Sequence, residues 1–319
     1  MLNGIVARLI GARILTSALI LFLVSVMIFV AAQFLPGDVA QELLGQSATP
    51  EAVAGLRHAM HLDQPAPLRF LEWLMDAARG RFGNSLVNGN PVSSLIGDRL
   101  RNTAVLAAIT AAVSVPLSLA AGIAAAILRD RPLDRVLSLV SIALVSVPEF
   151  LIATLAVLLF AVKLRWLPAL SSVSNTHSWT GFMRAYALPV MTLACVICAQ
   201  MFRMTRAAVI DALRAPHVEM ALLKGASRSR IVLRHALPNA VGPVANAVAL
   251  SLSFLFGGVI IVEVIFNYPG MAKLTVDAVS TRDMPLLQAC ALIFSAGYLA
   301  LVSLADIAAI LSNPRLRHP

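Results

Sequence analysis

The sequence predicts an all-α polytopic membrane protein with about six transmembrane helices. Hydrophobic residues make up 59% of the chain and charged residues only 13%, and the mean hydropathy is +0.84. A soluble domain carries about 25% charged residues. Apolar runs that exceed the roughly 20 residues needed to cross the hydrocarbon recur along the chain. We expect spans near 12–32, 102–127, 137–162, 187–209, 240–266 and 286–311.

The first apolar run is predicted to be a membrane anchor that stays in the protein. Arg8 and Arg13 precede it, as basic residues precede the apolar part of a signal peptide. The run is longer than the roughly 7–15 apolar residues of such a peptide. We therefore count it as the first span.

Basic residues predict the orientation of the spans. They precede the first run, crowd the short second connection, fill the fourth connection and close the chain. The positive-inside rule places these clusters, and with them both termini, on the cytoplasmic side. The net charge of +9 is thereby explained by topology. Because few aromatic residues accompany the basic clusters, nucleic acid is not an expected partner.

Two regions are expected, an N-terminal one at 1–101 and a membrane core at 102–319. The first contains a span and an extracytoplasmic segment, within which 52–61 and 68–78 are predicted to be short amphipathic helices. This segment is too small to build a substantial core of its own. It either caps the membrane bundle or docks an external partner.

The core contains a patterned cytoplasmic loop at 210–239. Small and apolar residues recur at helical spacing and predict one smooth face on a short helix; they are Val218, Ala221, Leu222 and Gly225. Gly225 is expected to end or bend this helix. Ser227 can cap a second helix, whose limit Pro238 marks. The pattern is typical of a helix that sits in a groove of another protein.

Motifs for catalysis or metal binding are missing from the sequence. It has no Gly-x-x-x-x-Gly-Lys-Ser/Thr phosphate loop, no His-Glu-x-x-His zinc motif and no Gly-x-Ser-x-Gly elbow. The pair Cys195 and Cys198 lies within a span, without the second pair that a structural zinc site needs. We expect a non-catalytic subunit with no metal site, in which these cysteines serve packing.

Polar residues within the spans are candidates for a translocation path. Glu149 follows Pro148 inside the predicted third span, where an unpaired charge costs at least about 2.5 kcal/mol. It either lines the path or is buried against another helix. The same two alternatives apply to Ser146, Gln200, Asn246 and Ser251. Glu263, at the end of the fifth span, is expected to form a salt bridge or a helix-end contact.

Several motifs resemble those of a known family. Glu219, Ala221, Gly225 and the pair Leu237-Pro238 match the Glu-Ala-Ala loop of the membrane subunits of ABC importers, although Met220 stands where that motif has Ala. The chain resembles the dipeptide/oligopeptide/nickel permeases, and the likeness runs nearly end to end. Its further segments are 35–38, 80–86, 146–150, 166–168, 188–189, 235–240, 263–270 and 313–317.

The resemblance implies a type I ABC importer permease fold with a cytoplasmic coupling helix, in the cell inner membrane. It also implies a second homologous permease subunit, two ATPase subunits and an extracytoplasmic substrate-binding protein as partners. ATP and Mg would be used by the ATPase subunits, with no cofactor bound by this chain. The implied ATPase-coupling residues are Glu219, Ala221, Leu222, Gly225, Arg228, Arg234, His235 and Pro238.

Peptides are the expected substrate, because the resembling family mostly imports them. Nickel or another small solute stays open, since selectivity in such systems lies largely in the binding protein. Two other classes also stay open. One is a secondary carrier that needs no ATPase, for which we find no clear internal repeat. The other is a membrane anchor that only recruits partners, which would leave the intramembrane polar residues unexplained.

Overall fold

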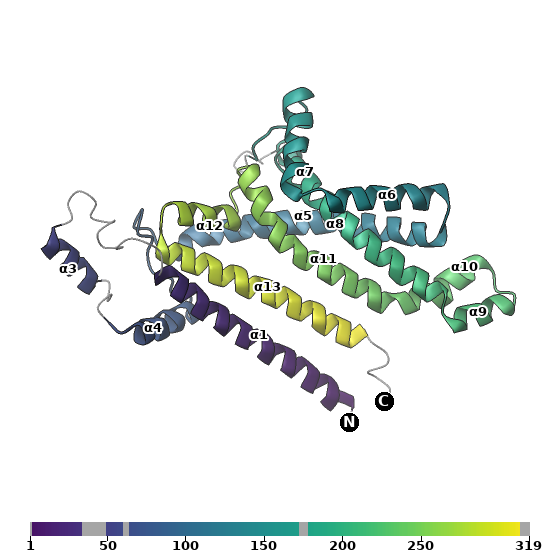
Figure 1. The fold of residues 1–319 in the computed structure, drawn as a ribbon, viewed down its shortest axis with the longest axis horizontal. Helices are drawn as coiled ribbons and strands as arrows, with labels where there is room; N and C mark the ends of the chain where they lie inside the picture. The colour runs from purple at the N-terminus through teal and green to yellow at the C-terminus, as the bar shows by residue number, and fades with distance from the viewer. Residues whose placement is uncertain (1, 34–48, 60–63, 172–177, 313–319) are drawn as a thin grey trace. The chain divides into compact units, whose positions relative to one another are not determined.

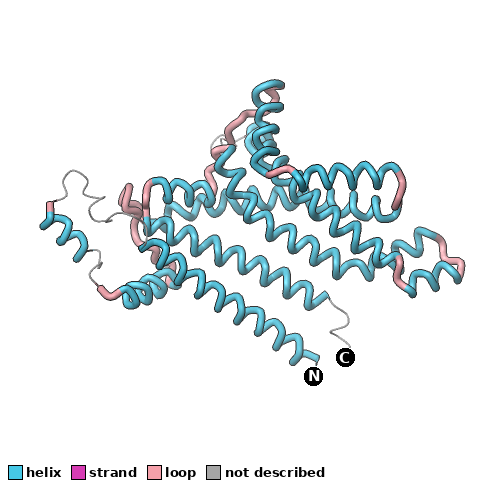
Figure 2. The backbone as a smooth tube through the Cα atoms, in the orientation of Figure 1, coloured by secondary structure: helices cyan, strands magenta, loops and turns pink. Residues whose placement is uncertain are grey.

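The computed structural model describes residues 2–33, 49–59, 64–171 and 178–312, and every regular element in these ranges is a helix (Figures 1 and 2). The long helices are α1 (Leu2–Gln33), α5 (Val92–Ile127), α8 (Trp179–Leu213), α11 (Leu237–Ile265) and α13 (Met284–Ser312). The shorter ones are α3 (Pro50–Ala59), α4 (Ala66–Ala78), α6 (Pro132–Ser146), α7 (Glu149–Ala156), α9 (Pro216–Leu223), α10 (Arg228–Arg230) and α12 (Met271–Ser280). Two π-helical stretches, η2 (Val157–Lys163) and η4 (Ile231–Ala236), extend α7 and α10.

The predicted all-α membrane fold is confirmed. Five helices in the described residues are long and apolar enough to cross a membrane, and α6 with α7 and η2 forms a sixth candidate span if the bent pair is counted as one. Helix α5 begins at Val92, well before the predicted span start at 102. The two helices predicted at 52–61 and 68–78 appear as α3 and α4, with residues 60 and 61 outside the described ranges.

The third predicted span, 137–162, falls on a sharply bent helix pair. Helix α6 ends at Ser146, α7 begins at Glu149, and the pair is bent by 103°. Pro148 is the cause, because its ring excludes helical geometry at the preceding residue. Val147 accordingly has an extended backbone, with φ −95° and ψ 127°.

The chain divides into two compact units. The first contains 1–15, 103–269 and 300–319, and the second contains 16–102 and 270–299. Helix α8 is central to the first unit, because 61% of the residues in its most apolar stretch are buried. The corresponding share is 22% both for α5 and for the helical stretch Ile231–Leu255. Glu263 of α11 is fully buried and accepts a hydrogen bond of 2.5 Å from the Thr103 hydroxyl of α5.

Close packing of α5 on α8 depends on Gly122. A Cβ atom at this position would lie 2.9 Å from Cβ of Thr205 and 3.1 Å from the carbonyl oxygen of Phe202. Both neighbours belong to α8, and one of them is backbone, which cannot swing aside. Small residues allow helix backbones to approach in membranes, so Gly122 fixes the spacing of these two helices.

The second unit has its own apolar cluster, in which α12 and α13 pack on the start of α5. Its buried members include Val92, Ile96, Met271, Leu274 and Leu286. Asp283 precedes α13 and ties the turn at 85–90 to this cluster. Its carboxylate accepts hydrogen bonds from the Ser85 hydroxyl and from the backbone N–H of Leu86, the latter at 3.2 Å.

Candidate functional site

The predicted coupling segment is a helical excursion between α8 and α11 (Figure 1). Helix α8 ends at Leu213, and Pro216 starts α9, where its missing N–H costs no helical hydrogen bond. Helix α9 ends at Leu223, and Gly225 follows with a φ of +79°, in the left-handed region that favours glycine. The predicted end of the short helix at Gly225 is thus confirmed.

A second helical stretch begins at Arg228, directly after Ser227, and is continuous with α11. It ends at Ala236 as a π-helical turn, and Leu237 starts α11 without a loop between them. The predicted limit of the second helix at Pro238 is wrong, because Pro238 lies in the first turn of α11 and the helical path continues through it. A wide π turn places the backbone so that the proline ring and its missing N–H are tolerated.

Helix α9 is held to η4 by a small apolar cluster. Val218 is 4% exposed and packs with Ile231 and Ala236, which are also buried. Val218 was expected to share one partner-facing surface with Leu222. The structure instead turns Val218 into the chain, while Leu222 is 59% exposed. The surface available to a partner is therefore narrower than the sequence pattern indicated.

A polar network also joins α9 to α11. The side-chain amide of Asn239 donates to the carbonyl oxygen of His235 at 2.7 Å and lies 3.0 Å from Nε2 of His217. His217 is in the first turn of α9, and Asn239 is near the start of α11. The sequence analysis missed the role of His217, because its neighbours in this network are 18 and 22 residues away.

The outer side of the segment combines apolar and charged groups. Glu219, Leu222, Gly225, Arg234 and Pro238 are exposed, Ala221 and His235 are half-buried, and the side chain of Arg228 lies outside the described part. Beside them is a largely apolar cavity of about 750 Å³. Its lining residues are Ile127, Leu213, Arg214, Val218, Glu219, Leu222, Ser229, Ile231, Val232 and Leu233.

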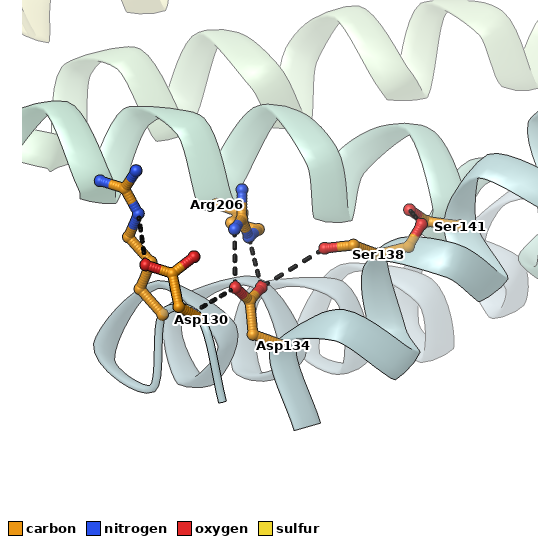
Figure 3. Close-up of polar contacts among 6 residues, drawn as sticks. Asp130, Asp134, Ser138, Ser141 and Arg206 are labelled. Carbon is orange, nitrogen blue, oxygen red and sulfur yellow. Dashed lines mark hydrogen bonds and ion pairs between the residues drawn. The ribbon is translucent and has the colours of Figure 1, made fainter. Parts of the chain in front are cut away.

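A bidentate ion pair joins α6 to α8, the helix that leads into this segment (Figure 3). Arg206 donates from Nε to Oδ1 of Asp134 at 2.6 Å and from Nη2 to Oδ2 at 2.7 Å. The Asp130 backbone N–H and the Ser138 hydroxyl also donate to this carboxylate, at 3.0 and 3.3 Å. The Asp134 side chain is 3% exposed. Such bidentate, charge-assisted geometry fixes two helices relative to each other.

The predicted path residues differ in burial and are not joined by hydrogen bonds in the described structure. Ser146 is exposed and donates to the Ile142 carbonyl oxygen, Gln200 is half-buried, Asn246 is exposed and Ser251 is buried. Among the described residues, no hydrogen bond joins any two of these four or links them to Glu149. Glu149 is the first residue of α7, and its Oε1 is buried without a hydrogen-bond partner in the described structure.

The fold and this segment define a class of protein: a multi-pass membrane component with a helical excursion between two spans. Residues 118–318 match the family described as binding-protein-dependent transport system inner membrane component. Residues 1–107 match the N-terminal part of such membrane components. The chain belongs to this family, and it is an inner-membrane permease subunit of an ABC transport system.

Named relatives cover the whole chain. It is 36% identical over 318 residues to the glutathione transport system permease protein GsiC of Escherichia coli (strain K12), with 100% of both chains covered. It is 33% identical over 306 residues to the probable peptide ABC transporter permease protein y4tP of Sinorhizobium fredii. That alignment covers 96% of this chain and 98% of the relative.

A pair of glycines on α11 allows the position of Glu149 to be tested. A Cβ atom on Gly258 would lie 2.6 Å from Oε1 of Glu149, whereas a Cβ atom on Gly257 would meet nothing within 4 Å. We expect Gly258→Ala to displace the carboxylate and to lower substrate transport several-fold. Because the Glu149 side chain is flexible, the loss of stability should be small, about 1 kcal/mol, at the low end for overpacking.

The matched control is Gly257→Ala, which should leave transport unchanged. Transport in membrane vesicles and thermal unfolding of the purified complex measure the two effects. Equal transport by the two variants would show that transport does not depend on the position of the Glu149 carboxylate next to Gly258 of α11.

Proposed function

We propose that this subunit imports short peptides, including glutathione-like ones, together with a second homologous permease. Two ATPase subunits would bind ATP and Mg and drive the cycle, and an extracytoplasmic binding protein would deliver the substrate. Both termini and the coupling segment would lie on the cytoplasmic side. The proposal rests on the permease relatives and on one structural observation, the exposed surface of α9 beside an apolar cavity.

The coupling segment suits a mechanical contact. Leu222 and Leu223 are 59% and 76% exposed, and Glu219 is exposed next to them. These side chains would enter a groove of an ATPase subunit, while Val218, His217 and Asn239 hold α9 to the rest of the chain. A motion of the ATPase subunits then moves α9 and α8 together. Coupling requires that these contacts differ in strength between two conformations of the transporter.

The substrate path would involve the break between α6 and α7. Pro148 ends the helical path there, and Glu149 starts α7 with a carboxylate inside the membrane region. Charged groups at such depth usually face a water-filled cavity or a partner. A carboxylate at this place suits the ammonium group of a peptide. Gln200, Asn246, Ser146 and Ser251 are further candidates for the path.

The test is ATP-driven uptake by the complete complex in liposomes. Labelled peptides and glutathione should accumulate only when two conditions are met. ATP must be present on the side of the membrane where the ATPase subunits lie, and the binding protein must be present. Nickel and other small solutes serve as competing substrates. Uptake by the two permeases alone would contradict the proposal and would favour a secondary carrier.

Cross-linking tests the contact itself. Leu223→Cys should cross-link to an ATPase subunit, and Trp179→Cys should not. Both native side chains are 76% exposed, and they are separated by most of α8, whose 35 residues span about 52 Å. Exposure is therefore matched and only position differs. If the Leu223→Cys variant forms no cross-link to an ATPase subunit, the docking proposal is contradicted.

A further inference from the structure

Helix α4 has an apolar surface much wider than its contacts inside the chain require. Successive residues turn by about 100° on a helix, so its apolar side chains cover more than half of the circumference. They run from Trp73 through Phe70, Leu74, Leu71 and Met75 to Leu68. The remaining arc carries the charged residues Arg69, Glu72, Asp76 and Arg79. Arg79 and Asp76 approach within 3.9 Å of each other on that arc.

One edge of the apolar surface packs on α1. The Phe70 ring lies 6.0 Å from that of Phe22 and 5.3 Å from that of Phe29, measured between centroids. The Trp73 ring lies 6.0 Å from that of Phe29. Edge-on and tilted aromatic contacts of this kind are favourable at such distances. They hold α4 against one stretch of α1.

That stretch belongs to the membrane-spanning part of α1. The candidate span runs from Arg8 to Gln33. Phe29 precedes Gln33 by four residues and Phe22 by eleven, which corresponds to about 6 and about 16 Å along the helix axis. Helix α4 therefore meets α1 within the half of the span that ends at Gln33.

The opposite edge of the apolar surface is uncovered by the described part of the chain. Leu68, Leu71 and Met75 are 53%, 50% and 51% exposed, and they follow one another at helical spacing. The adjoining surface of α1 is also exposed and apolar, with Leu19, Leu23 and Met27 each more than half exposed. Helices α1 and α4 thus both expose apolar side chains in the described structure.

We propose that α4 is an interfacial helix that lies in the bilayer, with Leu68, Leu71 and Met75 in contact with lipid acyl chains. Its charged arc faces the headgroups, and the long, exposed Arg79 side chain extends toward water. Interfacial amphipathic helices insert about 5–10 Å in this manner. The leaflet is the one at the Gln33 end of α1, the outer leaflet in the orientation proposed above. The segment between α1 and α5 is then anchored to the membrane by α4.

Nitroxide labels at two neighbouring positions of the complete complex in nanodiscs test this placement. Leu71→Cys lies on the apolar stripe, and Glu72→Cys lies one residue further, on the charged arc. For each label, the measured quantity is the ratio of its collision rate with oxygen to its collision rate with a water-soluble nickel chelate. This ratio should be at least about fivefold higher for the label at Leu71 than for the label at Glu72. Met75→Cys and Arg79→Cys form a second pair if the first does not fold. All variants carry serine at Cys195, Cys198 and Cys290.

Two outcomes would overturn the proposal. A Leu71 label as accessible to the nickel chelate as the Glu72 label would place α4 in water. A Leu71 label that neither reagent reaches would show that a protein surface, either the sister permease or the binding protein, covers the stripe. Neither readout depends on the substrate or on ATP, so failure here is separate from failure of the proposed function.

Discussion

Replacement of Asp134 by alanine should lower ATP-driven uptake at least about tenfold in protein that still reaches the membrane. The change leaves Arg206 without the two hydrogen bonds that it donates to the Asp134 carboxylate. Loss of one partner of a buried pair costs about 3–5 kcal/mol. Because the Arg206 side chain is 27% exposed, water replaces part of the lost interaction. We therefore expect a loss in stability at or below the lower end of that range.

The expected loss of uptake follows from where the pair lies. Arg206 is on α8, the helix that leads into α9, and Asp134 is in the first turn of α6. Helix α6 leads across the 103° break to Glu149 and α7. Gly122 lets α5 pack against the same part of α8, at Thr205. The Asp134–Arg206 pair joins α8 to α6, and the contact at Gly122 joins α8 to α5. Helix α8, which leads into the coupling segment, is therefore fixed to both of these consecutive helices.

Charge exchange separates this role from simple stability. The double variant Asp134→Arg with Arg206→Asp restores the attraction and should recover part of the uptake that either single variant loses. Ser138→Ala removes only the weaker hydrogen bond of 3.3 Å and should keep most of the uptake. Uptake and ATPase activity are measured together with thermal unfolding. Asp134→Ala with normal uptake, or with a loss that tracks stability alone, would contradict the proposed transmission between α8 and α6.

Hydropathy was sufficient to predict the all-helical fold and the approximate place of each span. The reason is that about 20 apolar residues are needed to cross a bilayer whatever the tertiary structure. Helix ends were less predictable: α5 starts ten residues before the predicted span, at Val92. Those residues are polar enough to escape a hydropathy criterion, although they continue the same helix and pack in the second unit.

The break at Pro148 was only partly predictable. A proline disfavours helical geometry at the residue before it, so Pro148 indicates where this helical path can bend. The sequence does not contain the angle of 103°, which depends on the packing of α7 against α8 and α11.

Contacts between residues far apart in sequence account for what was missed at the site. Arg206 and Asp134 are 72 residues apart, and the basic residue was attributed only to membrane orientation. The inward turn of Val218 was missed because periodicity defines a helical face but not which neighbour covers it. The end of α9 at Gly225 was predictable, since a left-handed φ is a local property that favours glycine.

Glu219→Lys should abolish association with the ATPase subunits without destabilising the chain. Glu219 is exposed, and within the described residues it has neither an ion pair nor a side-chain hydrogen bond. Substitutions at such positions usually change stability by no more than about 0.5 kcal/mol. A groove of an ATPase subunit that pairs with the Glu219 carboxylate would instead face the positive charge of the lysine, which is repelled there or left unpaired. Pull-down of the ATPase subunits, uptake and thermal unfolding distinguish the two effects.

Gly225 tests the shape of the same surface. Its φ of +79° strains most other residues, yet a Cβ atom there would meet nothing within 4 Å. Gly225→Val should therefore distort the end of α9 through the backbone alone and remove most uptake, whereas Gly225→Asn should retain it, because asparagine tolerates left-handed geometry. Combined with Glu219→Lys, Gly225→Asp should eliminate uptake. Retained pull-down by that double variant would contradict docking through α9, since it changes the charge at two exposed positions of this surface.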